Sequence, residues 1–124
     1  MRIGEFIKQV TTTKDTVRHY EELELIRPGW INGTREYSQK DTNDFQAIKE
    51  MQSLGLTLKE IQAIFEVKRD NGCGSIQLIN DVLKSLDNEL TIIYETEQEL
   101  NRKKIKINEM MGSLQALSVV SEKG

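Results

Sequence analysis

The chain has 124 residues, a single cysteine and a formal net charge of −3. This length suits one small domain with at most an appendage, and one cysteine excludes a secreted scaffold held together by internal disulfides. No segment approaches the roughly 18 uninterrupted apolar residues of a membrane span, and the N-terminus lacks an apolar signal core, so we expect a cytoplasmic protein with no membrane partner.

Two short helices are predicted at the N-terminus. Apolar residues recur there at i, i+3, i+4 and i+7, namely Ile3, Phe6, Ile7 and Val10. The threonines at 11–13 then offer N-caps for a second helix near residues 13–22, with Val17 and Tyr20 on its inner face. Two short helices joined by a tight turn suit a helix-turn-helix, although many helical hairpins have no role in DNA binding.

A β-hairpin follows the second helix. Asn32-Gly33 best fits a two-residue type I′ turn, because both positions tolerate positive φ. Trp30 and Ile31 precede this turn and residues 34–37 follow it. A small hairpin directly after a helix-turn-helix is a wing, so this segment favours a winged helix-turn-helix.

Two further helices complete the N-terminal part. Ser38 and Asp41 resemble a capping box, and Thr57 and Glu60 form a full one. The aromatic residues within the first 65 positions are Phe6, Tyr20, Trp30, Tyr37, Phe45 and Phe65. Large rings build compact cores, so we expect these elements to form one globular domain, a winged helix-turn-helix, over residues 1–70.

A turn at residues 70–74 separates this domain from a long helix over 75–118, followed by a short tail at 119–124. The helix carries a heptad seam of Ile76, Ile79, Leu83, Leu86, Leu90, Ile93, Glu97, Leu100, Lys104, Ile107, Met111 and Leu114. A small domain cannot cover so long a seam, so the simplest partner is the same helix of a second chain. The alternative is a helical hairpin, which would need a turn that the sequence does not show.

These elements predict a mainly α fold, and the chain resembles the MerR family of bacterial transcriptional regulators. The matching segments lie within residues 1–67, and they are Arg2–Glu5, Thr13–Glu22, Leu25–Ile26, Gly33–Ser38 and Leu54–Ile61. The seam helix matches the dimerisation helix of the family. Two departures are His19, which stands where the family has an aromatic ring, and a wing turn that is shorter than usual.

The resemblance implies a winged helix-turn-helix head followed by an antiparallel coiled coil in a homodimer. It implies binding to double-stranded promoter DNA at a near-palindromic site with a long spacer. It further implies that the protein bends and untwists this DNA in response to a signal, with RNA polymerase at the promoter as a further partner. The signal, and whether the output is activation or repression, stay open.

The residues expected to contact DNA lie on the second helix and the wing: Thr13, Lys14, Thr16, Arg18, His19, Tyr20, Arg35 and Tyr37. The alternative for the helix is an ordinary polar face, and for Tyr20 and Tyr37 it is a place in the core. Because the chain is acidic overall, Lys14, Arg18 and Arg35 must cluster on one face. We therefore expect three acidic residues, Glu21, Glu24 and Glu36, to be turned away from that face.

Cys73 lies between two glycines just before the long helix. It is either a reactive thiol sensor, since a helix N-terminus favours a thiolate, or an incidental cysteine. The metal-sensing members that the chain resembles use several cysteines, so we expect no metal site. We expect His19 to lie near the DNA rather than to bind a metal ion. We expect no cofactor and, because no acid pair, nucleophile triad or phosphate loop is present, no enzyme. The alternative function is a coiled-coil adaptor that binds DNA largely non-specifically and recruits a protein partner.

Overall fold

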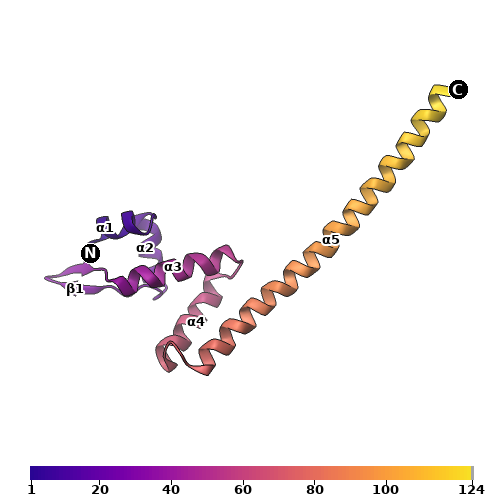
Figure 1. Cartoon of the computed structure of the whole chain (residues 1–124). Coiled ribbons are helices and arrows are strands. Elements are labelled where there is room, and N and C mark those ends of the chain that lie inside the picture. The colour runs from indigo at the N-terminus through magenta and orange to yellow at the C-terminus, as the bar shows by residue number, and fades with distance from the viewer. Residues whose placement is uncertain (124) are drawn as a thin grey trace. The chain divides into compact units, whose positions relative to one another are not determined.

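The computed structural model describes residues 1–123, and side chains up to residue 119. The helices and strands in chain order are α1 (Ile3–Gln9), α2 (Lys14–Glu22), β1 (Gly29–Ile31), β2 (Thr34–Glu36), α3 (Gln39–Ser53), α4 (Leu58–Asn71) and α5 (Ile76–Lys123) (Figure 1). The chain forms two compact units, of which the first is Met1–Leu86 and the second begins at Asp87. The predicted mainly α class with a small wing is confirmed.

Side-chain caps begin α2, α3 and α4. The hydroxyl of Thr13 accepts a 3.2 Å hydrogen bond from the backbone N–H of Thr16 at the start of α2. Ser38 opens α3 with a complete capping box, in which Asp41 supplies the carboxylate. A second complete box opens α4. These caps satisfy backbone donors that an isolated helix end leaves free, and they confirm the starts predicted for these helices.

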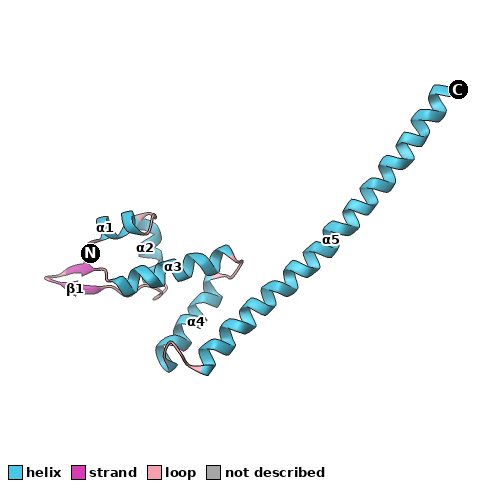
Figure 2. Cartoon of the chain, in the orientation of Figure 1, coloured by secondary structure: helices cyan, strands magenta, loops and turns pink. Residues whose placement is uncertain are grey.

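The wing is a two-stranded antiparallel hairpin, drawn in magenta in Figure 2. Asn32 and Gly33 form its turn with φ values of 51° and 76°. Positive φ at both positions is the requirement of a type I′ turn, so the predicted turn is confirmed. Trp30 lies opposite Arg35 in the register of the two strands.

Aromatic rings fill the centre of the first unit. The ring of Phe6 stacks on Tyr37 at 4.5 Å and meets Phe45 edge-on at 6.0 Å. Tyr20 packs against Phe45 at 5.4 Å. The expectation of an aromatic core is wrong for Trp30, whose side chain is 61% exposed. Strand β1 is exposed along its whole length, whereas β2 is half-buried.

The first turns of α5 belong to the first unit. Leu78 is buried in its core, and Val82 and Leu86 pack against that core. Ser75 caps this end, because its hydroxyl accepts a 3.1 Å hydrogen bond from the N–H of Leu78. The first compact unit therefore includes both the predicted domain over residues 1–70 and the first turns of α5.

Beyond Leu86, α5 continues unbroken to Lys123. The helical-hairpin alternative is therefore wrong, and the segment expected to be a tail is helical as far as it is described. The exposed apolar residues of the seam in the second unit are Leu90, Ile93, Leu100, Ile107, Met111 and Leu114. Within the described residues, we find no helix with the length and apolar character needed to cross a membrane.

Candidate nucleic-acid interface

Helix α2 presents a polar face to solvent. Val17 and Tyr20 are buried, whereas Lys14, Arg18 and His19 are exposed. This is the orientation that the sequence predicts. The hydroxyl of Thr13, which caps the helix, also lies 2.9 Å from that of Thr16, so the two threonines stabilise the start of α2.

A hollow of about 300 Å³ lies between the start of the chain, α2 and the wing. Three arginines line it, Arg2, Arg18 and Arg35, together with Trp30 on the wing. The guanidinium of Arg35 lies 4.9 Å above the ring of Trp30, within the range of a cation–π interaction. Three guanidinium groups around one hollow create the local positive field that a phosphate needs, even though the chain is acidic overall.

Sequence reasoning missed Arg2 and Trp30 as parts of this hollow. Arg2 precedes the first helix, so no periodicity places it on a face. Trp30 was assigned to the core because it is aromatic. The signal that could have found it is its place in a short edge strand beside a two-residue turn, where one face has no cover.

Glu21 lies among the arginines rather than away from them. One of its carboxylate oxygens, Oε1, is 3.1 Å from Nε of Arg35, and the other, Oε2, is 4.0 Å from Nε of Arg18. The expectation that Glu21 is turned away from the basic face is therefore wrong. Its side chain is only 11% exposed, because α2 presses it against the wing. Of the other two acidic residues, Glu36 pairs with the N-terminal amine and Glu24 with Arg27.

Two of the expected DNA contacts are buried. Tyr20 donates a hydrogen bond to Gln52, and Tyr37 donates one of 2.8 Å to Glu21. Burial raises the pKa of Tyr37 well above its ordinary value of 10.0, and the hydrogen bond to the Glu21 carboxylate raises it further. Both hydroxyls are thus engaged within the fold, and the structure favours the core alternative for both residues.

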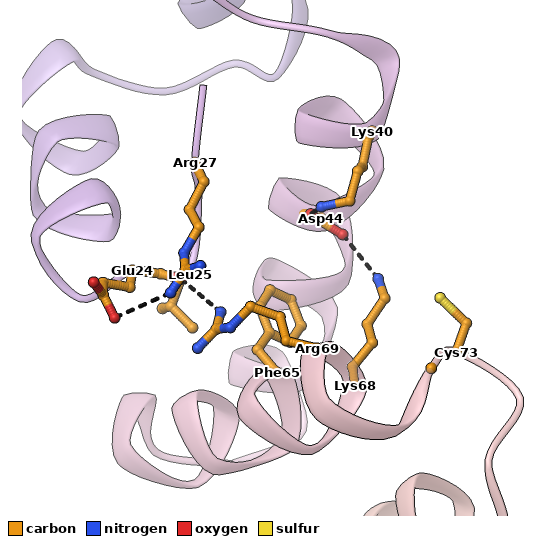
Figure 3. A pocket seen from close by; sticks show the side chains of 10 residues that line it. Glu24, Leu25, Arg27, Lys40, Asp44, Phe65, Lys68, Arg69 and Cys73 are labelled. Carbon is orange, nitrogen blue, oxygen red and sulfur yellow. Dashed lines mark hydrogen bonds and ion pairs between the residues drawn. The ribbon is translucent and has the colours of Figure 1, made fainter. Parts of the chain in front are cut away.

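Cys73 is exposed at the mouth of a second hollow, of about 190 Å³ (Figure 3). Leu25 and Phe65 give this hollow an apolar part, and the buried carboxylate of Asp44 is held in it by Lys40 and Lys68, both at 3.1 Å. Among the described side chains, no group of three or more His, Cys, Asp or Glu residues could hold a metal ion. The hollow that Cys73 lines thus combines an apolar part with charged side chains of both signs.

The chain is similar in sequence to known regulatory proteins. The mercuric resistance operon regulatory protein of Bacillus cereus is 43% identical over 68 residues, which are 53% of this chain and 52% of that protein. This chain thus matches about half the length of that relative. The regulator ZntR of Escherichia coli K12 is 26% identical over 119 residues, covering 94% of this chain and 77% of the relative.

A crystal structure of a putative MerR family transcriptional regulator from Listeria monocytogenes shares the fold, with a TM-score of 0.71 and 22% identity. The match covers 86% of this chain and 83% of that one. The family model of MerR helix-turn-helix regulatory proteins matches residues 1–68, which is more than half of the chain. The chain therefore belongs to the MerR family of helix-turn-helix regulatory proteins.

Proposed function

We propose that this protein is a dimeric regulator that recognises a specific promoter sequence and distorts the DNA there in response to a signal. The observation that carries this proposal is the hollow formed by Arg2, Arg18 and Arg35 where α2 meets the wing. Arginines in such a place contact phosphates and fix the register of a helix on the duplex, while exposed residues of α2 reach base edges.

The dimer rests on the seam of α5. Apolar residues at heptad spacing stay exposed in a single chain, and Glu97 and Lys104 interrupt the seam and can fix its register. A second copy of α5, running antiparallel as the resemblance to the MerR family implies, would cover these side chains. Two heads at a fixed separation then match two halves of a near-palindromic operator.

Distortion of the promoter and contact with RNA polymerase belong to the same proposal, and the resemblance to the family supports them. A regulator that bends and untwists its site can change how the polymerase meets the two promoter elements. Bending a short stretch of DNA costs on the order of 1–6 kcal/mol of elastic free energy. The contacts between protein and DNA must supply that energy.

The deciding experiment is a hydroxyl-radical protection assay on the DNA upstream of the gene and its neighbours. A regulator gives a discrete footprint with two-fold symmetry, and reactivity to a probe of unstacked bases rises at its centre. Uniform protection of any sequence would contradict the proposal. It would favour the adaptor that grips DNA non-specifically and recruits a protein through α5.

A further inference from the structure

The carboxylate of Glu21 is the most unusual polar group of the interface. Its Oε1 atom accepts the hydrogen bond from Tyr37 and pairs with Arg35. Its Oε2 atom is buried and, within the part of the chain that the structure describes, has no hydrogen-bond partner. A buried oxygen without a partner costs free energy, so its position calls for a functional explanation.

The geometry of the two ion pairs is informative. Both Arg18 and Arg35 turn their Nε edge towards Glu21. A guanidinium carries further N–H donors on its two Nη atoms, and among the described side chains Arg18 and Arg35 form ion pairs with Glu21 alone. Glu21 can therefore fix both arginines through their Nε atoms, while their Nη groups stay available to a phosphate.

The charge of Glu21 acts against DNA binding in general. Non-specific affinity comes almost entirely from the attraction between basic side chains and phosphates. A carboxylate between two of the arginines weakens that attraction on every sequence. At the operator the penalty is offset, because arginines that are already ordered lose less conformational entropy when the fitted contacts form.

We propose that Glu21 is a positioning residue that holds Arg18 and Arg35 ready for DNA and lowers the affinity for non-specific DNA, so that it raises specificity. This inference rests on the proposed function, which supplies the operator. If Glu21 had a purely structural role, its loss would change the affinity for non-specific DNA in the opposite direction. Loss of a structural carboxylate weakens binding to all DNA, whereas loss of this one strengthens binding to non-specific DNA.

The test is Glu21→Gln, which removes the charge and keeps the shape and an oxygen for the Tyr37 hydroxyl. Affinities are measured over a range of salt on two probes, a short duplex of mixed sequence and the operator that the wild type selects from a random pool. We expect the affinity for the mixed duplex to rise about two- to fivefold, because Arg18 and Arg35 are partly exposed and solvent screens their attraction to Glu21. The salt dependence should steepen by up to about one unit of slope, and the ratio of operator to mixed-duplex affinity should fall.

The matched control is Glu66→Gln, the same change at an exposed glutamate of α4 that has no ion pair among the described side chains. It should leave the ratio of affinities unchanged. An unchanged or lower affinity of Glu21→Gln for the mixed duplex overturns the proposal, and so does an equal rise on both probes. Failure of the wild type to select any operator would instead contradict the proposed function, while the mixed duplex would still report on Glu21.

A measurement on the wild type covers the case in which Glu21→Gln does not fold. The Nε proton of Arg35 should exchange with solvent more slowly than that of Arg2, because Arg35 has its Nε against the Glu21 carboxylate and Arg2 forms no ion pair with a described side chain. NMR spectra of the arginine side chains give the exchange rates of both Nε protons, and Arg→Lys variants assign the signals. Equal rates would show that Glu21 does not hold Arg35, and the proposal would fall.

Discussion

The hydroxyl of Tyr20 on α2 donates a 2.7 Å hydrogen bond to the side-chain carbonyl of Gln52 on α3. This bond ties α2 to α3, so Tyr20→Phe should lower the free energy of unfolding by about 1 kcal/mol. Affinity for DNA should stay the same, because the ring keeps its place. Urea unfolding and a binding titration check both results. Weaker DNA binding at unchanged stability would restore Tyr20 as a phosphate contact.

The raised pKa of Tyr37 predicts a loss of stability in alkali. Below pH 10 the tyrosine is protonated in both states, and its contribution is complete. As the pH rises above 10, the unfolded chain loses the proton first, so stability falls by up to about 1.4 kcal/mol per pH unit. Tyr37→Phe should lack this extra slope. Unfolding curves across this range, compared between the two proteins, would contradict the prediction if their slopes were equal.

Removal of a guanidinium from the hollow should weaken DNA binding. Arg18→Ala and Arg2→Ala should each lower affinity and flatten the salt dependence by up to about one unit of slope, since each loses a phosphate contact. Lys84→Ala, an exposed residue of α5, serves as the control. An unchanged salt dependence for either arginine variant would remove that residue from the interface.

The exposed seam of α5 predicts that one charge can separate two chains. Leu90→Asp should convert the dimer into a monomer, because an aspartate in an apolar seam would be buried without a partner. Asn88→Asp places the same charge on the same helix away from the seam and should leave the dimer intact. Sedimentation velocity gives the mass in each case. A monomeric wild type would contradict the prediction directly.

The exposure of Cys73 predicts ready alkylation of its thiol in the folded protein. If this thiol is a sensor, Cys73→Ser should abolish the response of the promoter to oxidants and electrophiles without changing thermal stability. A reporter gene measured with wild type and variant decides the matter. An identical response in both would leave Cys73 as an incidental residue.

Local features were readable from the sequence. The capping boxes of α3 and α4 and the turn at Asn32-Gly33 depend on residues within four positions of one another, and the structure has all of them. The inward orientation of Val17 and Tyr20 likewise follows from helical periodicity.

Features that depend on packing between elements were not readable. Charge alone suggested that Glu21 would avoid the arginines, but its place is set by how α2 meets the wing, and this brings Arg35 to its carboxylate. Trp30 is exposed because it lies on β1, the exposed strand of the hairpin, and residue type does not reveal this. Membership of the family predicted neither arrangement.

The burial of Leu78 sets a practical boundary for work on the head alone. A fragment cut in the turn at residues 72–74 would remove one wall of the core and expose the apolar side chains that Leu78 and Val82 cover. Such a fragment should aggregate or unfold at a lower temperature than the full chain. A head intended for crystallisation with DNA should instead end after Leu86, where the first compact unit ends.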